Sequence, residues 1–329
     1  MKIGITYDLK ADYQAMGFSE EEAAEFDKIE TIDAIDHALQ ECGYTTERIG
    51  HAKSLIDAIG KEKCWDLVFN ICEGYHGIGR EAQVPAILDL YGIPYVFSDP
   101  LVLSLTLHKG MTKRVIRDLG LPTADFAIVS NPDDISRIDL PYPLFAKPVA
   151  EGTGKGINMN SKIRNPEELK ASCLEKLDKY RQAVLVETFL PGREFTVGIV
   201  GTGDLSKSIG LMECHFRESA AADIYSYENK ANYEEYMSYS TPTDDAAEAV
   251  QQLALDAWKG LGCRDGGRID IRMDANGVPN FIEVNPLAGL HPVDSDLVII
   301  AGKSGYSYTD LIRMIMDSAM LRLRESGNS

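Results

Sequence analysis

The stretch GRIDIRMDANGVPNFIEVNP, residues 267–286, has the pattern of two β-strands joined by a short turn. Asn276-Gly277 between two strand-like runs is typical of a two-residue type I′ turn, because both residues readily adopt positive φ angles. Such a turn places Ala275 opposite Val278 and sets the register of the whole hairpin. The sequence therefore predicts an antiparallel hairpin near the C-terminal end of the chain.

In this register the polar residues of the two strands gather on one face. Asp270 lies opposite Glu283, and Arg268 lies opposite Asn285. Directly opposed residues point to the same side of a sheet, and two opposed carboxylates repel each other by up to about 1 kcal/mol. A divalent cation between them would remove that repulsion. Magnesium prefers carboxylate and other oxygen ligands, so the hairpin predicts a metal site formed by Asp270, Glu283 and Asn285.

The opposite face of the hairpin is apolar and is expected to pack in the core, with Ile269, Ile271, Ile282 and Val284. Pro279 cannot donate to the strand ladder and can mark a bulge. A register shift by one residue would separate the two acids. The alternative interpretation is an ordinary amphipathic hairpin whose charged face lies in water.

The composition is that of a globular protein, because 44% of the 329 residues are hydrophobic and 26% are charged. A chain of this length is expected to fold as two or three packed subdomains. Its formal net charge of −18 disfavours binding to nucleic acid or to anionic lipid. A bound nucleotide would therefore need a local basic pocket and a cation.

The six cysteines have no CxxC spacing and do not cluster with histidines, which disfavours a disulfide framework or a zinc site. The first residues, MKIGITYDLK, run straight into a strand pattern without the apolar segment of a signal peptide. The apolar runs are too short to span a membrane. We expect a cytoplasmic protein that does not associate with membranes.

Short apolar strands alternate with helices over roughly the first hundred residues, which predicts a parallel α/β unit. Its expected strands are residues 2–7, 67–71 and 95–97, and its expected helices are residues 20–42 and 82–90. A second unit has expected helices at about 103–119 and 167–180 and a strand at 183–187. A third unit begins near residue 191 and combines the hairpin with helices at about 246–261 and 308–324.

A glycine-rich loop follows the apolar strand that ends near Lys147. In this loop, residues 151–156 (EGTGKG), closely spaced glycines let backbone N–H groups approach a phosphate, and Thr153 adds a hydroxyl. The loop is not a Walker A motif, because its GK pair is followed by glycine. It indicates a phosphate site beside Lys147 or, alternatively, a flexible connection between two strands.

The other candidates for nucleotide binding are isolated residues. Lys109 lies in a basic segment and Lys230 lies among tyrosines and acids, and a solvated surface is the ordinary alternative for both. The segment VLVETFLPGREF, residues 184–195, ends a strand with Glu187 and reaches Glu194 after a Pro-Gly pair. Backbone exposed there can pair with the edge of adenine, and Glu194 can accept ribose hydroxyls. A plain interdomain hinge explains the same pattern.

Taken in order, these elements resemble the ATP-grasp superfamily, and most closely its D-alanine–D-alanine ligases. The resemblance covers about residues 93–323 and rests on IPYVFSDP, LTLHKGMTK, LGLPTADF, AKPVAEGTGKGI, VLVETFLPGREFTVGIV, LGCRDGGRIDIRMDANG and FIEVNPLAGL. It implies an α/β (α+β) ATP-grasp fold with three subdomains and the nucleotide held between the second and third. The subdomains would be residues 1–102, 103–190 and 191–329.

The resemblance also implies roles for the candidate residues. ATP would contact Lys109, Lys147, Glu151, Gly152, Thr153, Gly154, Glu187, Phe189, Leu190, Glu194 and Lys230. Two Mg²⁺ ions, or Mn²⁺, would be held by Asp270, Glu283 and Asn285. Lys230 would reach the γ-phosphate, and Arg268 would stabilise the tetrahedral intermediate.

The residues around the amino-acid sites differ from the family pattern. Thr153-Gly154 stands where the family has two serines, and Ala231 follows Lys230 where the family has a tyrosine. The acceptor site would contain Gly289, His291, Asp294 and Asp296. Carboxylates there would repel the carboxylate of an acceptor. We therefore hypothesise an acceptor that is positively charged or lacks a carboxylate at this place.

Three functions follow from these patterns. The first is an ATP-dependent carboxylate–amine ligase that makes a D-alanyl dipeptide through an acyl phosphate. The second is a ligase for a different amino acid or amine, and the third is a nucleotide-binding protein without catalysis. The complete set of lysines and hairpin residues favours an enzyme. Its partners would be small amino acids or amines, and members of the family often form homodimers.

Overall fold

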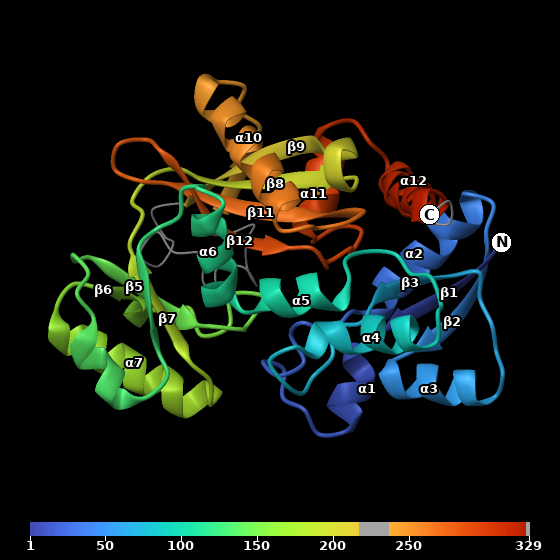
Figure 1. Cartoon of the computed structure of the whole chain (residues 1–329), viewed down its shortest axis with the longest axis horizontal. Coiled ribbons are helices and arrows are strands. Elements are labelled where there is room, and N and C mark those ends of the chain that lie inside the picture. The colour runs from blue at the N-terminus through green and yellow to red at the C-terminus, as the bar shows by residue number, and fades with distance from the viewer. Residues whose placement is uncertain (217–236, 327–329) are drawn as a thin grey trace.

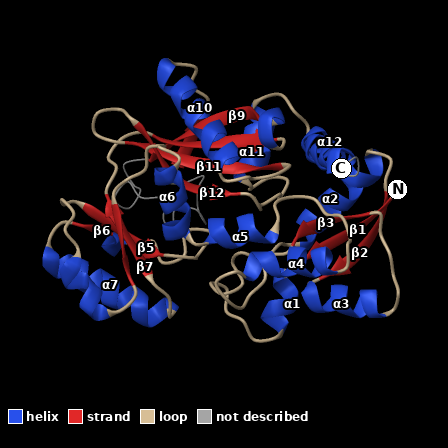
Figure 2. Cartoon of the chain, viewed as in Figure 1, coloured by secondary structure: helices blue, strands red, loops and turns tan. Residues whose placement is uncertain are grey.

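The computed structural model describes residues 1–216 and 237–326, which form three sheets with helices packed against them (Figure 1). Figure 2 shows the mixture of helices and strands in each part of the molecule. The helix α12 (Tyr308–Ser326) near the C-terminus lies beside the N-terminal part of the chain. This architecture agrees with the predicted α/β (α+β) class.

The first sheet is parallel and has the order β2-β1-β3. It consists of β1 (Lys2–Tyr7), β2 (Thr45–Gly50) and β3 (Leu67–Ile71). The helices of this part are α1 (Lys10–Ala15), α2 (Ile29–Glu41), α3 (Ala52–Gly60) and α4 (Gln83–Leu90). The predicted parallel α/β unit is therefore confirmed, although β2 and α3 were not predicted.

Two details of the N-terminal prediction are wrong. The helix predicted from residue 20 begins only at Ile29, because residues 20–26 form turns that place Glu25 and Asp27 in a pocket wall. The strand predicted at residues 95–97 is a single bridge between Tyr95 and Val68. Phe97 has a φ angle of 77°, which is incompatible with a regular strand.

The second sheet is antiparallel and has the order β4-β7-β5-β6. Its strands are β4 (Phe126–Val129), β5 (Leu144–Pro148), β6 (Lys162–Ile163) and β7 (Val184–Thr188), and α7 (Pro166–Tyr180) packs against it. Two helices connect it to the first sheet, α5 (Pro100–Leu107) and α6 (Lys109–Asp118). They were predicted as one helix, which is interrupted at His108 because that residue caps α6 by accepting from the Met111 N–H.

The third sheet is antiparallel and has the order β10-β9-β8-β11-β12. Its strands are β8 (Glu194–Val200), β9 (Lys207–Phe216), β10 (Met237–Ser240), β11 (Gly266–Met273) and β12 (Pro279–Asn285). The helices α10 (Asp245–Gly260) and α11 (Asp296–Lys303) pack against it. Short 3₁₀ helices occur at Arg80–Ala82, Pro132–Arg137, Met159–Ser161 and Gly203–Leu205.

The hairpin of β11 and β12 has the predicted pairs at the polar end, with Arg268 opposite Asn285 and Asp270 opposite Glu283. The predicted two-residue turn is wrong, because the Asp274 N–H donates to the Val278 carbonyl and leaves three residues in the loop. The register shifts back between Asp270 and Ile271, where β12 contains one extra residue. The bulge compensates for the longer loop and restores the predicted pairing of the acids.

The bulge also changes which side chains enter the core. Phe281 is fully buried together with Ile269, Ile271 and Val284 in one cluster with α10. Ile282, which was predicted on the apolar face, instead lines a pocket. The hairpin therefore has an apolar core face and a functional face, but Phe281 takes the place expected for Ile282.

The three-residue loop depends on Gly277, whose φ angle is 77°. A Cβ atom added there would meet nothing within 4 Å, so the strain comes from the backbone alone. We expect Gly277→Ala to reduce the free energy of unfolding by about 1–2 kcal/mol, the cost of a left-handed conformation for alanine. Urea unfolding measures this. The matched control is Gly302→Ala in α11, which is equally uncrowded and should be neutral or stabilising; equal effects of the two changes would contradict the expectation.

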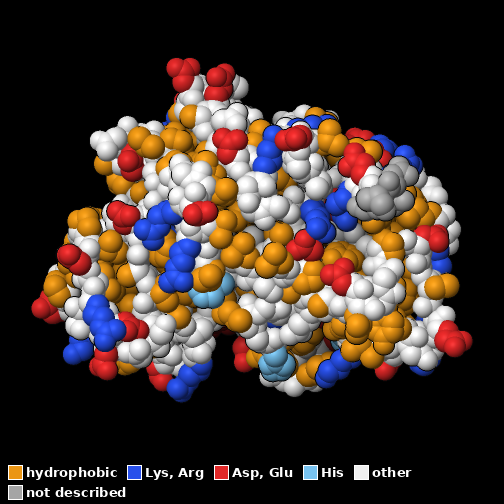
Figure 3. Space-filling model, in the orientation of Figure 1, with side chains coloured by type: hydrophobic (Ala, Val, Ile, Leu, Met, Phe, Trp, Pro, Cys, Tyr) orange, Lys and Arg blue, Asp and Glu red, His pale blue; other side chains and the backbone are white. Residues whose placement is uncertain are grey.

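None of the helices within residues 1–216 and 237–326 is both long and apolar enough to cross a membrane. On the face shown in Figure 3, Lys and Arg side chains are scattered among acidic and hydrophobic ones.

Candidate active site

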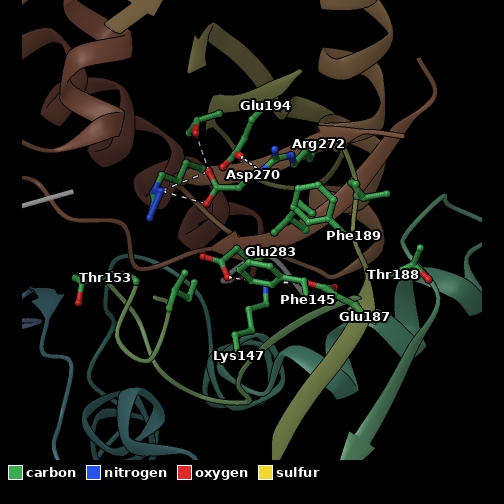
Figure 4. A pocket seen from close by; sticks show the side chains of 16 residues that line it. Phe145, Lys147, Thr153, Glu187, Thr188, Phe189, Glu194, Asp270, Arg272 and Glu283 are labelled. Atoms are coloured by element: carbon green, nitrogen blue, oxygen red, sulfur yellow. Dashed lines mark hydrogen bonds and ion pairs between the residues drawn. The ribbon is translucent and has the colours of Figure 1, made fainter. Parts of the chain in front are cut away.

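A pocket lies between the second and third sheets. Phe145 and Lys147 reach it from β5, Glu187 from β7, and Asp270 and Glu283 from the hairpin (Figure 4). Each of these residues lies at a strand position, so the two sheets hold the side chains in place. Glu187 and Asp270, the nearest of these residues across the two sheets, are 83 positions apart, so only the packing of the two sheets brings them together.

A buried charge cluster lies under this pocket. The Glu187 carboxylate is 2.8 Å from Lys113 Nζ and 3.3 Å from Lys147 Nζ. Burial raises the pKa of Glu187, but the two lysines outweigh this effect and hold the pKa below its ordinary value. Glu187 therefore lines the pocket as predicted, while its charge is neutralised by lysines. Lys113, which the sequence analysis did not single out, is fully buried.

The two lysines predicted to contact phosphate meet the hairpin at Glu283. Glu283 Oε2 is 3.4 Å from Lys109 Nζ and 3.8 Å from Lys147 Nζ. Lys109 Nζ also donates to the Glu151 carbonyl at 2.7 Å, which links it to the glycine loop. Burial raises the pKa of Glu283, but Lys109 and Lys147 dominate and lower it to about 2. Glu283 is therefore a carboxylate at neutral pH.

The second hairpin carboxylate, Asp270, has a different environment. It accepts hydrogen bonds from Thr196 Oγ1 at 2.8 Å and Asn285 Nδ2 at 3.3 Å, and Arg268 Nη1 lies 3.2 Å away. Burial raises the pKa of Asp270 to about 6; Arg268 opposes the rise, and Glu283 adds to it. A cation at this face would stabilise the charged form.

The residues fit a magnesium ion that is shared with a nucleotide. Asp270, Glu283 and Asn285 offer two carboxylates and one amide oxygen on one face of the hairpin. Among the described residues, no group of three or more His, Cys, Asp or Glu side chains is arranged to hold a metal alone. Magnesium commonly takes one or two carboxylates and completes its shell with phosphate oxygens and water.

The far end of the pocket combines an aromatic ring with polar groups. Arg272 Cζ lies 5.1 Å from the centre of the Phe189 ring, and Lys162 Nζ lies 4.1 Å from it. Glu194 Oε2 accepts from Arg272 Nη1 at 2.8 Å, and burial raises the pKa of Glu194. Leu190 also lines this end. Arg272 was missed by the sequence analysis, although it follows Asp270 by two residues and therefore shares its face.

Phe189 offers a flat surface for a purine base. We expect Phe189→Ala to weaken binding of an ATP analogue by about tenfold, because stacking of a base on an aromatic ring contributes about 1–3 kcal/mol. Calorimetric titration measures the affinity. Phe189→Tyr keeps the ring and should bind almost as the parent does; an alanine variant with unchanged affinity would place the base elsewhere.

The glycine loop lies between this pocket and a second one. Thr153 and Gly154 have φ angles of 50° and 74°, and the Thr153 hydroxyl is buried without a hydrogen-bond partner. The Gly152 N–H donates to Glu25 Oε1 at 2.8 Å, and Lys155 Nζ is 3.3 Å from the same oxygen. Glu25, which the sequence analysis did not single out, thus ties the loop to the N-terminal part.

The second pocket shares Thr153, Arg268 and Glu283 with the first. Its lining also contains the four predicted acceptor-site residues, Gly289, His291, Asp294 and Asp296.

The two acids of this predicted acceptor site are not equivalent. Asp296 is 6% exposed and its Oδ2 is 2.9 Å from Arg268 Nη1, so its charge is already compensated. Asp294 Oδ2 is 3.3 Å from His291 Nδ1 and is half-exposed. The repulsion of an acceptor carboxylate expected from these two acids is therefore reduced at Asp296, whose charge Arg268 offsets.

Comparison with known proteins shows which family the chain belongs to. Residues 115–317 match the family described as "D-ala D-ala ligase C-terminus". The chain belongs to the D-alanine–D-alanine ligase family. A D-alanine–D-alanine ligase of Marinomonas sp. is 34% identical over 261 residues, covering 78% of each protein. A protein of Sinorhizobium fredii named "Uncharacterized protein y4sG" is 30% identical over 310 residues, covering 90% of this chain and 89% of that protein.

Solved structures show the same ATP-grasp fold. D-alanine–D-alanine ligase from Bacillus anthracis, complexed with ATP, has a TM-score of 0.73 and 24% identity and covers 99% of both chains. The VanG D-Ala:D-Ser ligase of Enterococcus faecalis has a TM-score of 0.74 and 19% identity, covering 97% of this chain and 99% of that one. Members of the fold therefore include ligases with different acceptors, so membership of the family leaves the acceptor open.

Lys230, predicted to reach the γ-phosphate, lies outside the described residues. Within the described part, every other predicted nucleotide or metal residue except Gly152, Glu151, Lys109 and Asn285 lines the first pocket, and those four line the second. The residues predicted to bind the nucleotide and the metal therefore lie around two adjoining pockets.

Proposed function

We propose that this protein is an ATP- and Mg²⁺-dependent carboxylate–amine ligase, with D-alanine–D-alanine ligase or a close relative as the best-supported activity. The supporting observation is the lining shared by the two pockets. Thr153, Arg268 and Glu283 contribute to both, so a phosphate in the first pocket would meet a carboxylate in the second. Ligation through an acyl phosphate requires that the γ-phosphate and the donor carboxylate lie next to each other.

The first step would transfer the γ-phosphoryl group to the donor carboxylate. A carboxylate oxygen forms the bond to phosphorus, the bond to the bridging oxygen breaks, and ADP leaves. Lys109 and Lys147 would offset charge on the transferred group, because both ammonium groups point to the place where Glu283 meets the pocket. Magnesium, when bound by Asp270, Glu283 and Asn285, would supply the remaining charge neutralisation and orient the phosphates.

The second step would form the amide bond. The amine nitrogen of the acceptor attacks the acyl carbon, the carbon–oxygen bond breaks, and phosphate leaves with that oxygen. Arg268 would stabilise the developing oxyanion from its position between Asp270 and Asp296, which holds the guanidinium in place. The loop at residues 151–156 would keep water away from the acyl phosphate, since Thr153 borders both pockets.

We further propose three subdomains with boundaries near residues 102 and 190 and with the nucleotide between the second and third. This division is supported by the three sheets, which lie within residues 2–71, 126–188 and 194–285. The first pocket lies between the second and third of these sheets.

A second candidate is a ligase of the same mechanism with an acceptor other than D-alanine. His291 and Asp294 favour it, because an imidazole and a carboxylate in the lining of the second pocket can contact an acceptor differently from a neutral hydroxyl side chain.

The assay for both candidates is ADP release measured with ATP, Mg²⁺ and a panel of D- and L-amino acids and diamines. A ligase releases ADP only when donor and acceptor are present. Best activity with D-alanine alone supports the first candidate, and best activity with another amine supports the second. ATP hydrolysis that is independent of any amino acid would contradict both and favour a nucleotide-binding protein without ligase activity.

A further inference from the structure

A fully buried lysine, Lys113 of α6, lies behind the wall of the first pocket. Its Nζ atom is 2.8 Å from Glu187 Oε2 and donates a hydrogen bond to Thr123 Oγ1 at 2.7 Å. Glu187 lines the pocket, whereas Lys113 does not line it and is 0% exposed. A ligand in the pocket would therefore experience the charge of Lys113 only through the carboxylate of Glu187.

The second cation beside Glu187 has a different position. Lys147 Nζ is 3.3 Å from Glu187 Oε1 and 3.8 Å from Glu283 Oε2, so it lies between the two carboxylates. Lys147 also lines the pocket and can turn to a bound phosphate. Burial raises the pKa of Glu187, and Lys113 contributes more than Lys147 to the opposing effect. Lys113 is therefore the counter-ion that Glu187 keeps when Lys147 contacts a phosphate.

Glu187 lies at the aromatic end of the pocket. Phe145 is its partner in the register of β5 and β7, and Phe189 follows it by two residues. Both rings line the pocket, with 6.5 Å between their centres. In the view of Figure 4, Glu187 and Phe189 lie on one side, Thr153 of the glycine loop lies on the other, and Glu283 lies between them. A nucleotide with its phosphates at Glu283 and the glycine loop would place its base beside Glu187.

The carboxylate of Glu187 can accept a further hydrogen bond. An ionised carboxylate is only an acceptor, and it offers about four lone-pair positions. Lys147 lies against Oε1 and Lys113 lies against Oε2, which leaves a position for a donor on a ligand. An amino group on the base would supply that donor. A ring carbonyl at the same place would bring a second acceptor against the negative charge.

We propose that Lys113 is a positioning residue for nucleotide selection, which keeps Glu187 an anionic acceptor when Lys147 turns to the phosphates and so makes the pocket prefer a purine with an amino group at position 6. The inference rests on the proposed ligase function and specifies its nucleotide site. Without Lys113, phosphate binding would leave Glu187 without a counter-charge, and a buried carboxylate in that state favours its protonated form. A protonated carboxyl group both donates and accepts, so it would no longer distinguish an amino group from a carbonyl.

The test compares three nucleotides that differ at position 6 of the purine. ADP carries an amino group there, IDP a carbonyl oxygen, and purine riboside diphosphate a hydrogen atom. Binding to the full chain is measured by calorimetry with Mg²⁺ and without amino acids. We expect ADP to bind at least about tenfold more tightly than purine riboside diphosphate, because hydrogen bonds to charged groups are the stronger kind. IDP should bind no more tightly than purine riboside diphosphate. Equal binding of ADP and IDP, or no binding of ADP, would overturn the proposal.

Two variants of Lys113 assign the preference to its charge. Lys113→Met removes the ammonium group, and Lys113→Gln replaces it with a neutral group that can still donate to Glu187. Each should lower the ratio of ADP to IDP affinity by at least about fivefold, because the counter-charge is lost. A lysine with only a structural role would change both affinities equally and leave the ratio as it is. Lys170→Met, which replaces an exposed lysine of α7, is the control and should keep the parent ratio.

Circular dichroism identifies the variants that are folded, and an unchanged ratio in a folded Lys113 variant would contradict the inference. Glu187→Gln provides a test that leaves Lys113 in place. It removes the anionic acceptor itself and should also lower the ratio by at least about fivefold, since an amide both donates and accepts. An unchanged ratio in Glu187→Gln would equally overturn the proposal.

Activity assays separate this inference from the proposed function. Amino-acid-dependent turnover of ATP and ITP with equal kcat/KM would refute the role of Lys113 and leave the ligase function standing. Selective binding of ADP that depends on Lys113, without amino-acid-dependent ADP release from ATP, would refute the ligase function and leave the role of Lys113 standing.

Discussion

Replacing Glu283 with glutamine is expected to lower amino-acid-dependent ADP release by about 10³-fold, because loss of a metal-binding carboxylate removes several kcal/mol of transition-state stabilisation and each 1.4 kcal/mol is a factor of ten. Glu283 is the carboxylate that meets both Lys109 and Lys147 and borders both pockets. The loss is measured as the initial rate at saturating ATP and Mg²⁺. A reduction of less than tenfold would argue against a metal at this hairpin.

Nucleotide binding distinguishes a metal role of Glu283 from a purely structural one. Without metal, Glu283→Gln should bind an ATP analogue at least as tightly as the parent, because a negative charge beside the phosphates has been removed. With Mg²⁺, the parent should gain affinity and the variant should gain much less. Glu248→Gln, which changes the same charge on the surface, should behave as the parent in both conditions. Equal Mg²⁺ effects in all three proteins would contradict the metal assignment.

Replacing Lys113 with methionine is expected to reduce the free energy of unfolding by about 3 kcal/mol, at the lower end of the range for breaking a buried ion pair. Lys113 Nζ lies 2.8 Å from Glu187 and donates to Thr123 Oγ1 at 2.7 Å, and the side chain is fully buried. In the variant, Lys147 still offsets part of the Glu187 charge, so the lower end of the range applies. Urea unfolding measures the change.

Two further variants test the cause of that destabilisation. Lys170→Met replaces an exposed lysine of α7 and should change stability by less than about 0.5 kcal/mol. Adding Glu187→Gln to Lys113→Met should restore part of the lost stability, because the unpaired carboxylate is then absent. If Lys113→Met and Lys170→Met are equally stable, the buried pair contributes little to folding.

The hairpin shows how local sequence can predict a site although one step of the prediction is wrong. The alternation of polar and apolar residues correctly places Asp270, Glu283 and Arg268 on one face, because opposed residues share a face whatever the loop looks like. The loop is one residue longer than predicted, and the bulge at Ile282 compensates for it. Such a bulge depends on the packing of Phe281 in the core, which the pattern of a single strand does not reveal.

The residues that sequence analysis missed act through contacts between distant segments. Lys113 has the pattern of a solvated helix lysine, and only the packing of α6 against β7 buries it beside Glu187. Glu25 reaches the glycine loop from 127 residues away. The second pocket likewise combines Asp27 with Glu73 and Glu81 from another segment. Motif spacing describes residues within one helix, strand or loop, so it does not predict contacts between residues of distant segments.

The helix boundaries were missed for related reasons. The spacing of apolar residues from residue 20 onward fits a helix. In the structure Glu25 and Asp27 line the second pocket, and α2 begins after them at Ile29. The period between residues 103 and 119 fits one helix, but His108 ends the first half and caps the second. In both cases the spacing of apolar residues predicts a continuous helix, but polar side chains with specific positions interrupt it.

The transfer of oxygen from the substrate carboxylate to phosphate is the central step of the proposed mechanism. D-Alanine, or the carboxylate substrate that best supports ADP release, is labelled with ¹⁸O in its carboxylate and incubated with ATP and Mg²⁺, and the phosphate is analysed by mass spectrometry. An acyl phosphate predicts one labelled oxygen in each phosphate released together with ADP. Unlabelled phosphate, or release of AMP and pyrophosphate, would contradict it.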